Sequence, residues 1–162
     1  MPHRYAIAIG SNRRHGRHGA PEGVVRAAIA ALEAAGMTLI AVSPIIPTPA
    51  LGPAGRSFAN AAVIVAADID PPALLAKLKA MEAAFGRRRG RRWGARVLDL
   101  DIVLWSGGRW SRHGDRLVIP HRALELRDFV LRPLSTIAPD WRTGVGARTV
   151  RHARARLIRR AG

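Results

Sequence analysis

The sequence predicts an α+β fold with a ferredoxin-like βαββαβ core, in which a mainly antiparallel sheet carries helices on both faces. The first observation is that strand-like and helix-like apolar patterns follow one another as β-α-β-β-α-β between Arg4 and Trp105. The second is that glycine, proline and polar residues separate these patterns. The third is an apolar strand at residues 97–105, whose burial on both sides requires the residues after Gly107 to extend the sheet edge and cover its second face.

The first strand and helix are predicted in the N-terminal part of the chain. Residues 4–10 are mostly apolar and stop at Gly10-Ser11-Asn12, which is typical of a strand that runs into a turn. Pro21 suits the first turn of a helix, and the apolar residues after it follow helical spacing. Gly36 ends this helix.

Two further strands flank a long loop. Residues 37–46 form the second predicted strand, and Pro44 within it indicates an edge position or a bulge. Residues 47–58 are rich in proline and glycine, and loops of this length without regular structure are often functional. Residues 60–67 (NAAVIVAA) form the third predicted strand.

The remaining elements surround the apolar fourth strand. Residues 68–72 turn into an amphipathic helix that precedes it, and Gly107-Gly108 after it predicts a hairpin. Residues 117–121 suggest a short strand leading to a turn, and residues 122–138 suggest short helical pieces. A basic, weakly amphipathic helix is expected at residues 147–160.

The composition bounds the class of protein. With 162 residues and 48% hydrophobic content, residues 1–162 are expected to form one domain. The chain has no cysteine, which excludes disulfides and thiolate metal sites, and we expect a cytoplasmic protein because no membrane span or signal peptide is evident. A net charge of +16 favours an anionic partner, although the cations are almost all arginine, as a GC-rich genome would also produce.

Two acidic residues interrupt the fourth strand. Alternation places Asp99 and Asp101 on one face with Val97 and Val103. The other face is expected to be pure core and is formed by Leu98, Leu100, Ile102 and Leu104. Two carboxylates about 7 Å apart repel by about 2 kcal/mol at an effective dielectric near 20. A bound Mg²⁺ would offset this repulsion; an ion-pair network with Arg92 and Arg96 is the structural alternative.

A glycine- and arginine-rich segment at residues 86–94 precedes this strand. Its arginines are suited to bind phosphate, but a solvated or RNA-contacting loop is the alternative. No Walker-type phosphate loop is present, so a phosphate site here would consist of the two carboxylates, metal ions and arginines.

The segment RWGARVLDLDIVLW, residues 92–105, closely resembles the signature of the 6-hydroxymethyl-7,8-dihydropterin pyrophosphokinase family. Further matching segments follow the family order, and together they cover most of the chain. They are AIGSN at 8–12, TPALGP at 48–53, FANAAV at 58–63, VIPH at 118–121 and RDFVLRPL at 127–134. The resemblance implies transfer of the β,γ-pyrophosphate of ATP to the pterin hydroxymethyl group in folate biosynthesis, which leaves AMP.

The resemblance also implies a set of site residues. Asp99 and Asp101 match the pair that holds two Mg²⁺ ions on the ATP phosphates. The implied catalytic positions are Arg87, Arg96, Asp99, Asp101 and His121. The implied ATP-binding positions are Arg87, Arg89, Arg92, Arg96, Arg116, His121 and Arg127. The implied pterin-binding positions are Thr48, Leu51, Phe58, Asn60, Trp93 and Phe129, with the two phenylalanines as stacking rings.

The chain departs from the common family pattern at Ala95, where proline is frequent, and at Phe58, where tyrosine is frequent. The arginine loop also differs in length, so Arg88 is able to exchange roles with Arg87 or Arg89. We expect a monomer whose partners are ATP and the pterin, with neither nucleic acid nor membrane.

Each position also has a structural alternative. The two phenylalanines would then be core, Asn60 a turn former, and His121, Arg116 and Arg127 solvated surface residues. For the whole chain, the rival function is an RNA-binding α/β plait, which shares this strand order and basic charge. The predicted strands carry aliphatic residues and two aspartates instead of the exposed aromatics that such a module needs.

Overall fold

The structure is a computed structural model, and it describes residues 2–12, 16–48, 57–86, 97–112, 114 and 116–162. The elements in chain order are β1 (His3–Ser11), α1 (Pro21–Ala34), β2 (Thr38–Val42), β3 (Ile46–Thr48), β4 (Phe58–Ala67), α2 (Pro71–Ala84), β5 (Asp99–Trp105), β6 (Trp110–Ser111), β7 (Val118–Ile119), the 3₁₀-helix η1 (Leu124–Leu126), α3 (Asp128–Ile137) and α4 (Val150–Ala161). Among these helices, none has the length and apolar character needed to cross a bilayer.

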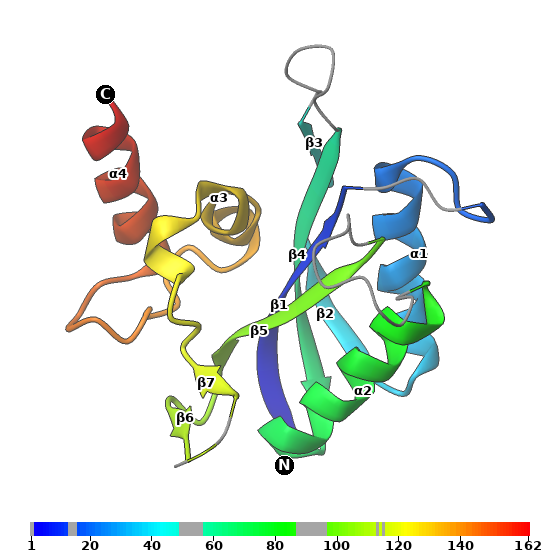
Figure 1. Cartoon of the computed structure of the whole chain (residues 1–162). Helices are drawn as coiled ribbons and strands as arrows, with labels where there is room; N and C mark the ends of the chain where they lie inside the picture. The colour runs from blue at the N-terminus through cyan, green and yellow to red at the C-terminus, as the bar shows by residue number, and fades with distance from the viewer. Residues whose placement is uncertain (1, 13–15, 49–56, 87–96, 113, 115) are drawn as a thin grey trace.

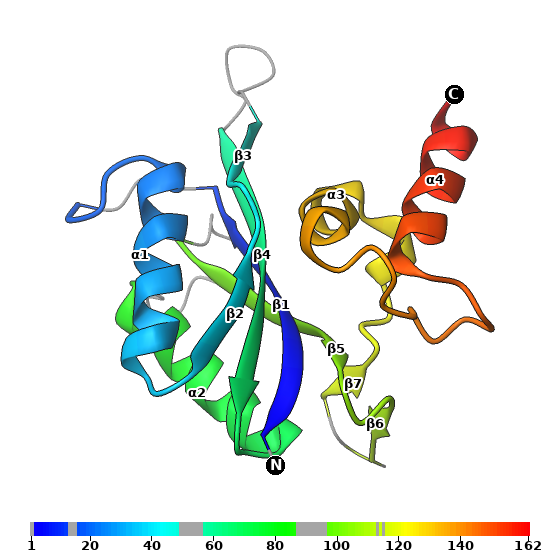
Figure 2. The ribbon, with the colours of Figure 1, turned by 180° about the vertical axis from the view of Figure 1, so that it is seen from behind.

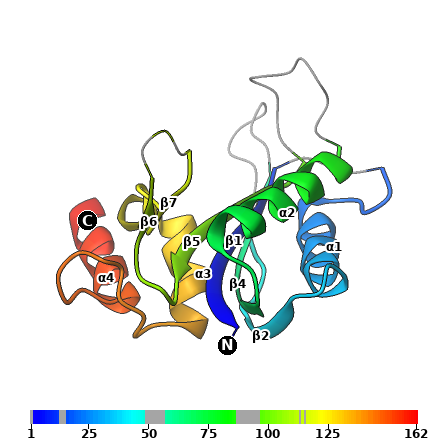
Figure 3. The same ribbon diagram turned by 90° about the horizontal axis from the view of Figure 1, so that it is seen from below.

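A five-stranded sheet with the order β2-β4-β1-β5 forms the centre of the molecule, and β3 pairs with β4 beside β2. All the pairings of this sheet that the structure describes are antiparallel. Helices α1 and α2 cover one face, and α3 and α4 lie on the other (Figures 1, 2 and 3). The predicted βαββαβ core with helices on both faces is therefore confirmed.

The two faces of the sheet differ in the size of their side chains. On the α1–α2 face, β1 contributes large buried residues, Tyr5, Ile7 and Ile9. On the opposite face it contributes Ala6 and Ala8, which pack in the cluster that includes Val130, Leu131 and Leu134 of α3. Small residues let a helix approach a sheet closely, so α3 lies near the strands whose residues form the pocket described below.

The predicted burial of β5 on both faces is only partly right, because Asp99 and Asp101 are partly exposed on the pocket side. The prediction that residues after Gly107 extend the sheet edge is wrong, since β6 and β7 form a separate two-stranded sheet. The alternation of β5 also breaks at a bulge. The pairing with β1 shifts between Ala6, which faces Leu104, and Ile7, which faces Ile102. Val103 is the extra residue, and both it and Leu104 pack in the cluster on the α3 face. The prediction that Leu104 shares the core face of Leu100 and Ile102 is therefore wrong, because a bulge reverses the facing of the residues beyond it.

Two further boundary predictions need correction. The single strand predicted at residues 37–46 is divided into β2 and β3, because Pro44 lacks the N–H that would continue the ladder with β4. The edge position that Pro44 suggested is confirmed, since β2 lies at the edge of the sheet. Gly108 does form a turn, with its N–H bonded to the Trp105 carbonyl, but β6 pairs with β7 and not with β5, so the predicted hairpin is wrong.

Candidate active site

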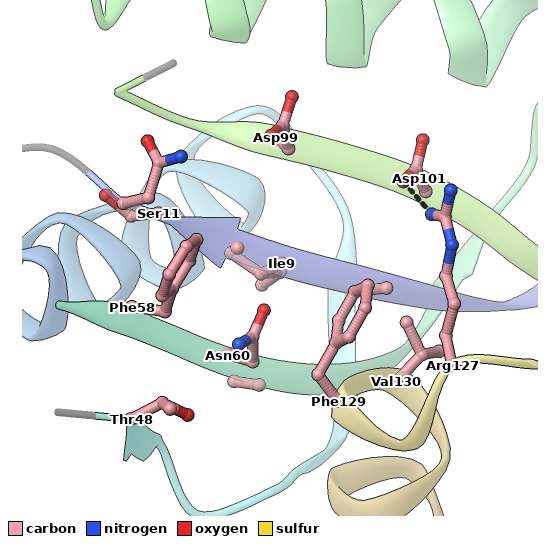
Figure 4. Close-up of a pocket in the computed structure, with 14 residues that line it drawn as sticks. Ile9, Ser11, Thr48, Phe58, Asn60, Asp99, Asp101, Arg127, Phe129 and Val130 are labelled. Carbon is pink, nitrogen blue, oxygen red and sulfur yellow. Dashed lines mark ion pairs between the residues drawn. The ribbon is translucent and has the colours of Figure 1, made fainter. Parts of the chain in front are cut away.

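A pocket of about 560 Å³ opens on the α3 side of the sheet, where β1, β4 and β5 meet the first turn of α3. Figure 4 shows side chains of β4, β5 and α3 around the same space, among them Asn60, Asp99 and Phe129. The residues that line it are Ala8, Ile9, Gly10, Ser11, Asn12, Thr48, Phe58, Asn60, Ala61, Asp99, Asp101, Arg127, Phe129 and Val130.

The strand register explains why polar side chains gather around Gly10. In β1, Gly10 pairs with Asn60 of β4 on one side and with Asp99 of β5 on the other. Directly paired residues extend their side chains to the same face, so Asn60 and Asp99 flank the glycine. A Cβ atom at Gly10 would lie 3.0 Å from Oδ1 of Asn60. The glycine therefore provides the space that the Asn60 amide occupies.

Asp99 and Asp101 lie on the same face of β5, and both line the pocket. The Asp101 carboxylate lies 4.0 Å from the Arg127 guanidinium, and both side chains are partly exposed. Such an exposed ion pair contributes little to stability, so it is readily exchanged for contacts with a ligand. Arg92 and Arg96, the partners in the structural alternative, lie outside the described residues.

The chemistry of these two carboxylates fits Mg²⁺. Magnesium in nucleotide sites is commonly held by one or two carboxylates, with substrate phosphates and water as its other ligands. Within the part of the chain that the structure describes, no group of three or more histidine or acidic side chains forms a complete cage for a metal ion. Asp99 and Asp101 would leave the other positions around Mg²⁺ to water and to an oxygen-rich substrate.

His121 is fixed beside the acidic pair from two directions. Its backbone N–H donates to the carbonyl of the bulged Val103 at 3.0 Å, which ties it to β5. Its Nδ1 accepts a hydrogen bond from the Ala123 N–H at 3.1 Å, so the proton of the neutral ring is on Nε2. Burial is the main cause that lowers the pKa of His121 below its usual value; the charge of Asp101 opposes this shift and that of Arg127 adds to it. The neutral ring therefore has one N–H donor to offer.

Phe58 and Phe129 are large apolar residues that the protein leaves exposed. Their exposed fractions are 44% and 51%, and both line the pocket. Phe58 begins β4 beside its pairing partner Thr48, and Phe129 extends from the first turn of α3. Figure 4 shows Asn60 between the two rings. Neither ring belongs to a core cluster, so the pocket has apolar surfaces that a flat ligand would cover.

Most of the predicted site residues that the structure describes come together in this pocket. They are Thr48, Phe58, Asn60, Asp99, Asp101, Arg127 and Phe129. His121 lines a neighbouring cavity of about 360 Å³. Arg116 is exposed and lines neither cavity. Leu51, Arg87, Arg88, Arg89, Arg92, Trp93, Ala95 and Arg96 lie outside the described residues.

Sequence reasoning assigned no role to the end of β1, which forms the floor of the pocket. Gly10, Ser11 and Asn12 all line it, and Oδ1 of Asn12 is buried without a hydrogen-bond partner. The available signal was a Gly-Ser-Asn segment directly after a buried strand, which was interpreted as a strand end and as part of the family resemblance, but without a role in the site. The pairing of Gly10 with Asn60 and Asp99 depends on strand order, which that local pattern does not contain.

Comparison with known proteins gives a consistent result. A family model described as 7,8-dihydro-6-hydroxymethylpterin-pyrophosphokinase matches residues 6–139. A 2-amino-4-hydroxy-6-hydroxymethyldihydropteridine pyrophosphokinase from Methylorubrum extorquens is 43% identical over 123 residues, which is 75% of each chain. The protein of the same name from Pseudomonas aeruginosa is 40% identical over 144 residues, or 88% of this chain and 85% of the relative.

A solved structure described as HPPK-DHPS in complex with substrates has the same fold. It matches with a TM-score of 0.74 at 13% sequence identity, over 99% of this chain. This chain spans only 44% of that longer chain.

Proposed function

The chain belongs to the 7,8-dihydro-6-hydroxymethylpterin-pyrophosphokinase family and is a pyrophosphokinase of folate biosynthesis, and we propose that the pocket on the α3 side of its sheet binds the pterin for this reaction. The hydroxymethyl oxygen of the pterin attacks the β-phosphorus of ATP. The bond between that phosphorus and the α–β bridging oxygen breaks, AMP leaves, and the hydroxyl proton is released. The family match supports this function over the RNA-binding alternative.

The pterin ring would lie between Phe58 and Phe129, with Asn60 at its edge. Aromatic rings stack on a flat heterocycle with a gain of about 0.5–1.5 kcal/mol beyond burial, and both rings are exposed to the pocket. A carboxamide offers one acceptor and two donors, which is the combination that a pterin edge needs. Thr48 adds a hydroxyl beside Phe58.

Asp99 and Asp101 would hold Mg²⁺, and we propose two ions. The metal would supply positive charge that offsets the charge of the ATP phosphates. The chain contributes further positive charge at Arg127, whose guanidinium lies 4.0 Å from Asp101 and is free to turn from the carboxylate to a phosphate. Because Nδ1 of His121 accepts from the Ala123 N–H, Nε2 is the ring nitrogen that would donate a hydrogen bond to a phosphate oxygen.

The observation that carries this proposal is the single pocket that combines two exposed aromatic rings, an amide and two carboxylates. The test is to incubate the protein with Mg-ATP and 6-hydroxymethyl-7,8-dihydropterin and to separate the nucleotide products by chromatography. AMP that forms only when the pterin is present is the expected result. ADP as the main product would overturn pyrophosphoryl transfer.

We also propose that the enzyme acts as a monomer in the cytoplasm, with ATP and the pterin as its partners and without nucleic acid. The acidic pair would repel a phosphate backbone in the absence of metal, which argues against nucleic acid as a partner. Light scattering during size-exclusion chromatography, with and without both substrates, tests the oligomeric state. A mass of twice the chain would contradict the monomer.

A further inference from the structure

Two residues that we assign to the site, Arg127 and Phe129, stand on either side of Asp128. Asp128 does not line the pocket itself; it contacts the C-terminal helix and also lines a smaller cavity of about 90 Å³ that it shares with Asn60 and Phe129. Oδ1 of Asp128 accepts a hydrogen bond from Nε of Arg154 in α4 at 3.3 Å. Both side chains are partly exposed, Arg154 by 33% and Asp128 by 49%. The first turn of α3 is thus held from outside by α4 while its neighbouring side chains face the pocket.

Helix α4 is itself firmly placed. Val150 and Ala153 are buried in the cluster that contains Val130, Leu131 and Leu134 of α3. Its start is capped by the Thr149 hydroxyl, which accepts a hydrogen bond from the His152 N–H. The preceding Arg148 forms an ion pair with Glu125, just before α3. Helix α4 is therefore anchored both to α3 and to the segment that leads into α3.

The first turn of α3 has no side-chain cap of its own. Its N-cap residue is Arg127, whose side chain makes no capping hydrogen bond. Instead, the Arg127 guanidinium lies near the Asp101 carboxylate and above the Phe129 ring, with its Cζ 5.6 Å from the ring centroid. Uncapped first turns fray readily, because their N–H groups lack partners. Asp128 interacts favourably with the helix dipole there, and Arg154 holds that carboxylate in place.

We propose that α4 is a positioning element for the pterin site, and that Arg154, through Asp128, sets the orientation of the helix turn that presents Phe129 and Arg127 to the substrates. This inference rests on the proposed function. The family match ends at residue 139, whereas α4 begins at Val150. A positioning role for α4 would make the pocket depend on a part of the chain outside that match. Arg154 does not line the pocket and acts only through Asp128.

The test compares Arg154→Ala, Asp128→Asn, the double variant and Arg154→Lys, with Arg159→Ala as the control on an exposed position of α4. We expect the pterin KM and the pterin Kd of Arg154→Ala and Asp128→Asn to rise about two- to fivefold, the range for an exposed ion pair. When both pterin and Mg-ATP are saturating, kcat should stay close to that of the wild type. Arg154→Lys should recover most of the loss, and the double variant should be no worse than either single variant.

Several outcomes would overturn the inference. One is an unchanged pterin Kd in Arg154→Ala, with or without a lower Tm, because that result assigns the ion pair to stability alone. Another is an equal rise of Kd in Arg159→Ala. A third is additive losses in the double variant. Failure of the proposed function is distinguishable, because the wild type would then form no AMP, whereas failure of this inference leaves wild-type AMP formation intact.

Discussion

Gly10→Ala is expected to weaken pterin binding without weakening the fold. Gly10 is absent from the glycines with positive φ, so its backbone accepts an L-residue. Replacing glycine at such a position commonly stabilises a protein by about 0.4–1 kcal/mol, because the unfolded chain loses freedom. The added Cβ would lie 3.0 Å from Oδ1 of Asn60, closer than ordinary contacts, so the amide must shift or rotate.

The size of the binding loss follows from the hydrogen bonds of the amide. Each contributes about 0.5–1.5 kcal/mol net, so disturbing two of them costs about 1–3 kcal/mol. The pterin Kd should therefore rise about five- to a hundredfold while the Tm stays equal or increases. Calorimetric titration of pterin and thermal unfolding measure the two effects separately.

The matched control is Gly16→Ala. Gly16 also lacks positive φ, and nothing lies within 4 Å of the Cβ that alanine would add there. Its pterin Kd should equal that of the wild type. Wild-type pterin affinity in Gly10→Ala would refute the assignment of Asn60 to the pterin edge.

Three further predictions concern the rings, the carboxylates and the histidine. Phe129→Ala should raise the pterin Kd about tenfold and leave Mg-ATP binding unchanged in calorimetry; equal losses for both ligands would mean a general packing role. Asp99→Asn and Asp101→Asn should each nearly abolish AMP formation. The Tm of the free protein should stay equal or rise, since removing one charge relieves about 2 kcal/mol of repulsion between the carboxylates. A lower Tm with retained activity would instead indicate a structural ion-pair network. Because the folded-state pKa of His121 is lowered from 6.5, the unfolded chain takes up its proton first, so the free energy of unfolding should fall as the pH drops from about 6.5 to that lowered pKa. Denaturant titrations at several pH values should show this loss reduced in His121→Gln, and an identical pH dependence in the variant would exclude His121 as its source.

The fold was largely predictable because each element of the core has a clear local signal. Alternation and helical spacing located the strands and helices of the βαββαβ unit, and proline and glycine located most of their ends. The bulge at Val103 was not predictable, because it depends on how β5 pairs with β1. The partner of β6 was missed for a related reason: Gly107-Gly108 reports a local turn and contains no information on which strand lies opposite Trp110.

The site was predicted less directly from local patterns than from resemblance. The acidic pair was visible in the strand itself, since charge in an apolar strand is unusual. Phe58 and Asn60 lie in β4 and Phe129 lies in α3, and only strand order and the placement of α3 bring them to one pocket with the acidic pair of β5. The link between Asp128 and Arg154 spans elements far apart in the chain, and an arginine in a basic helix gives no sign of its partner. Such long-range pairs require the tertiary structure.

The central claim, pyrophosphoryl transfer to a pterin, is tested most directly by following the β-phosphate of ATP. The enzyme is given ATP that carries radioactive phosphorus at the β position, together with Mg²⁺ and 6-hydroxymethyl-7,8-dihydropterin, and the products are separated. Our account predicts that the label leaves the nucleotide and is recovered in the pterin diphosphate, with unlabelled AMP as the second product. Label that remains in ADP, beside a pterin monophosphate, would contradict it.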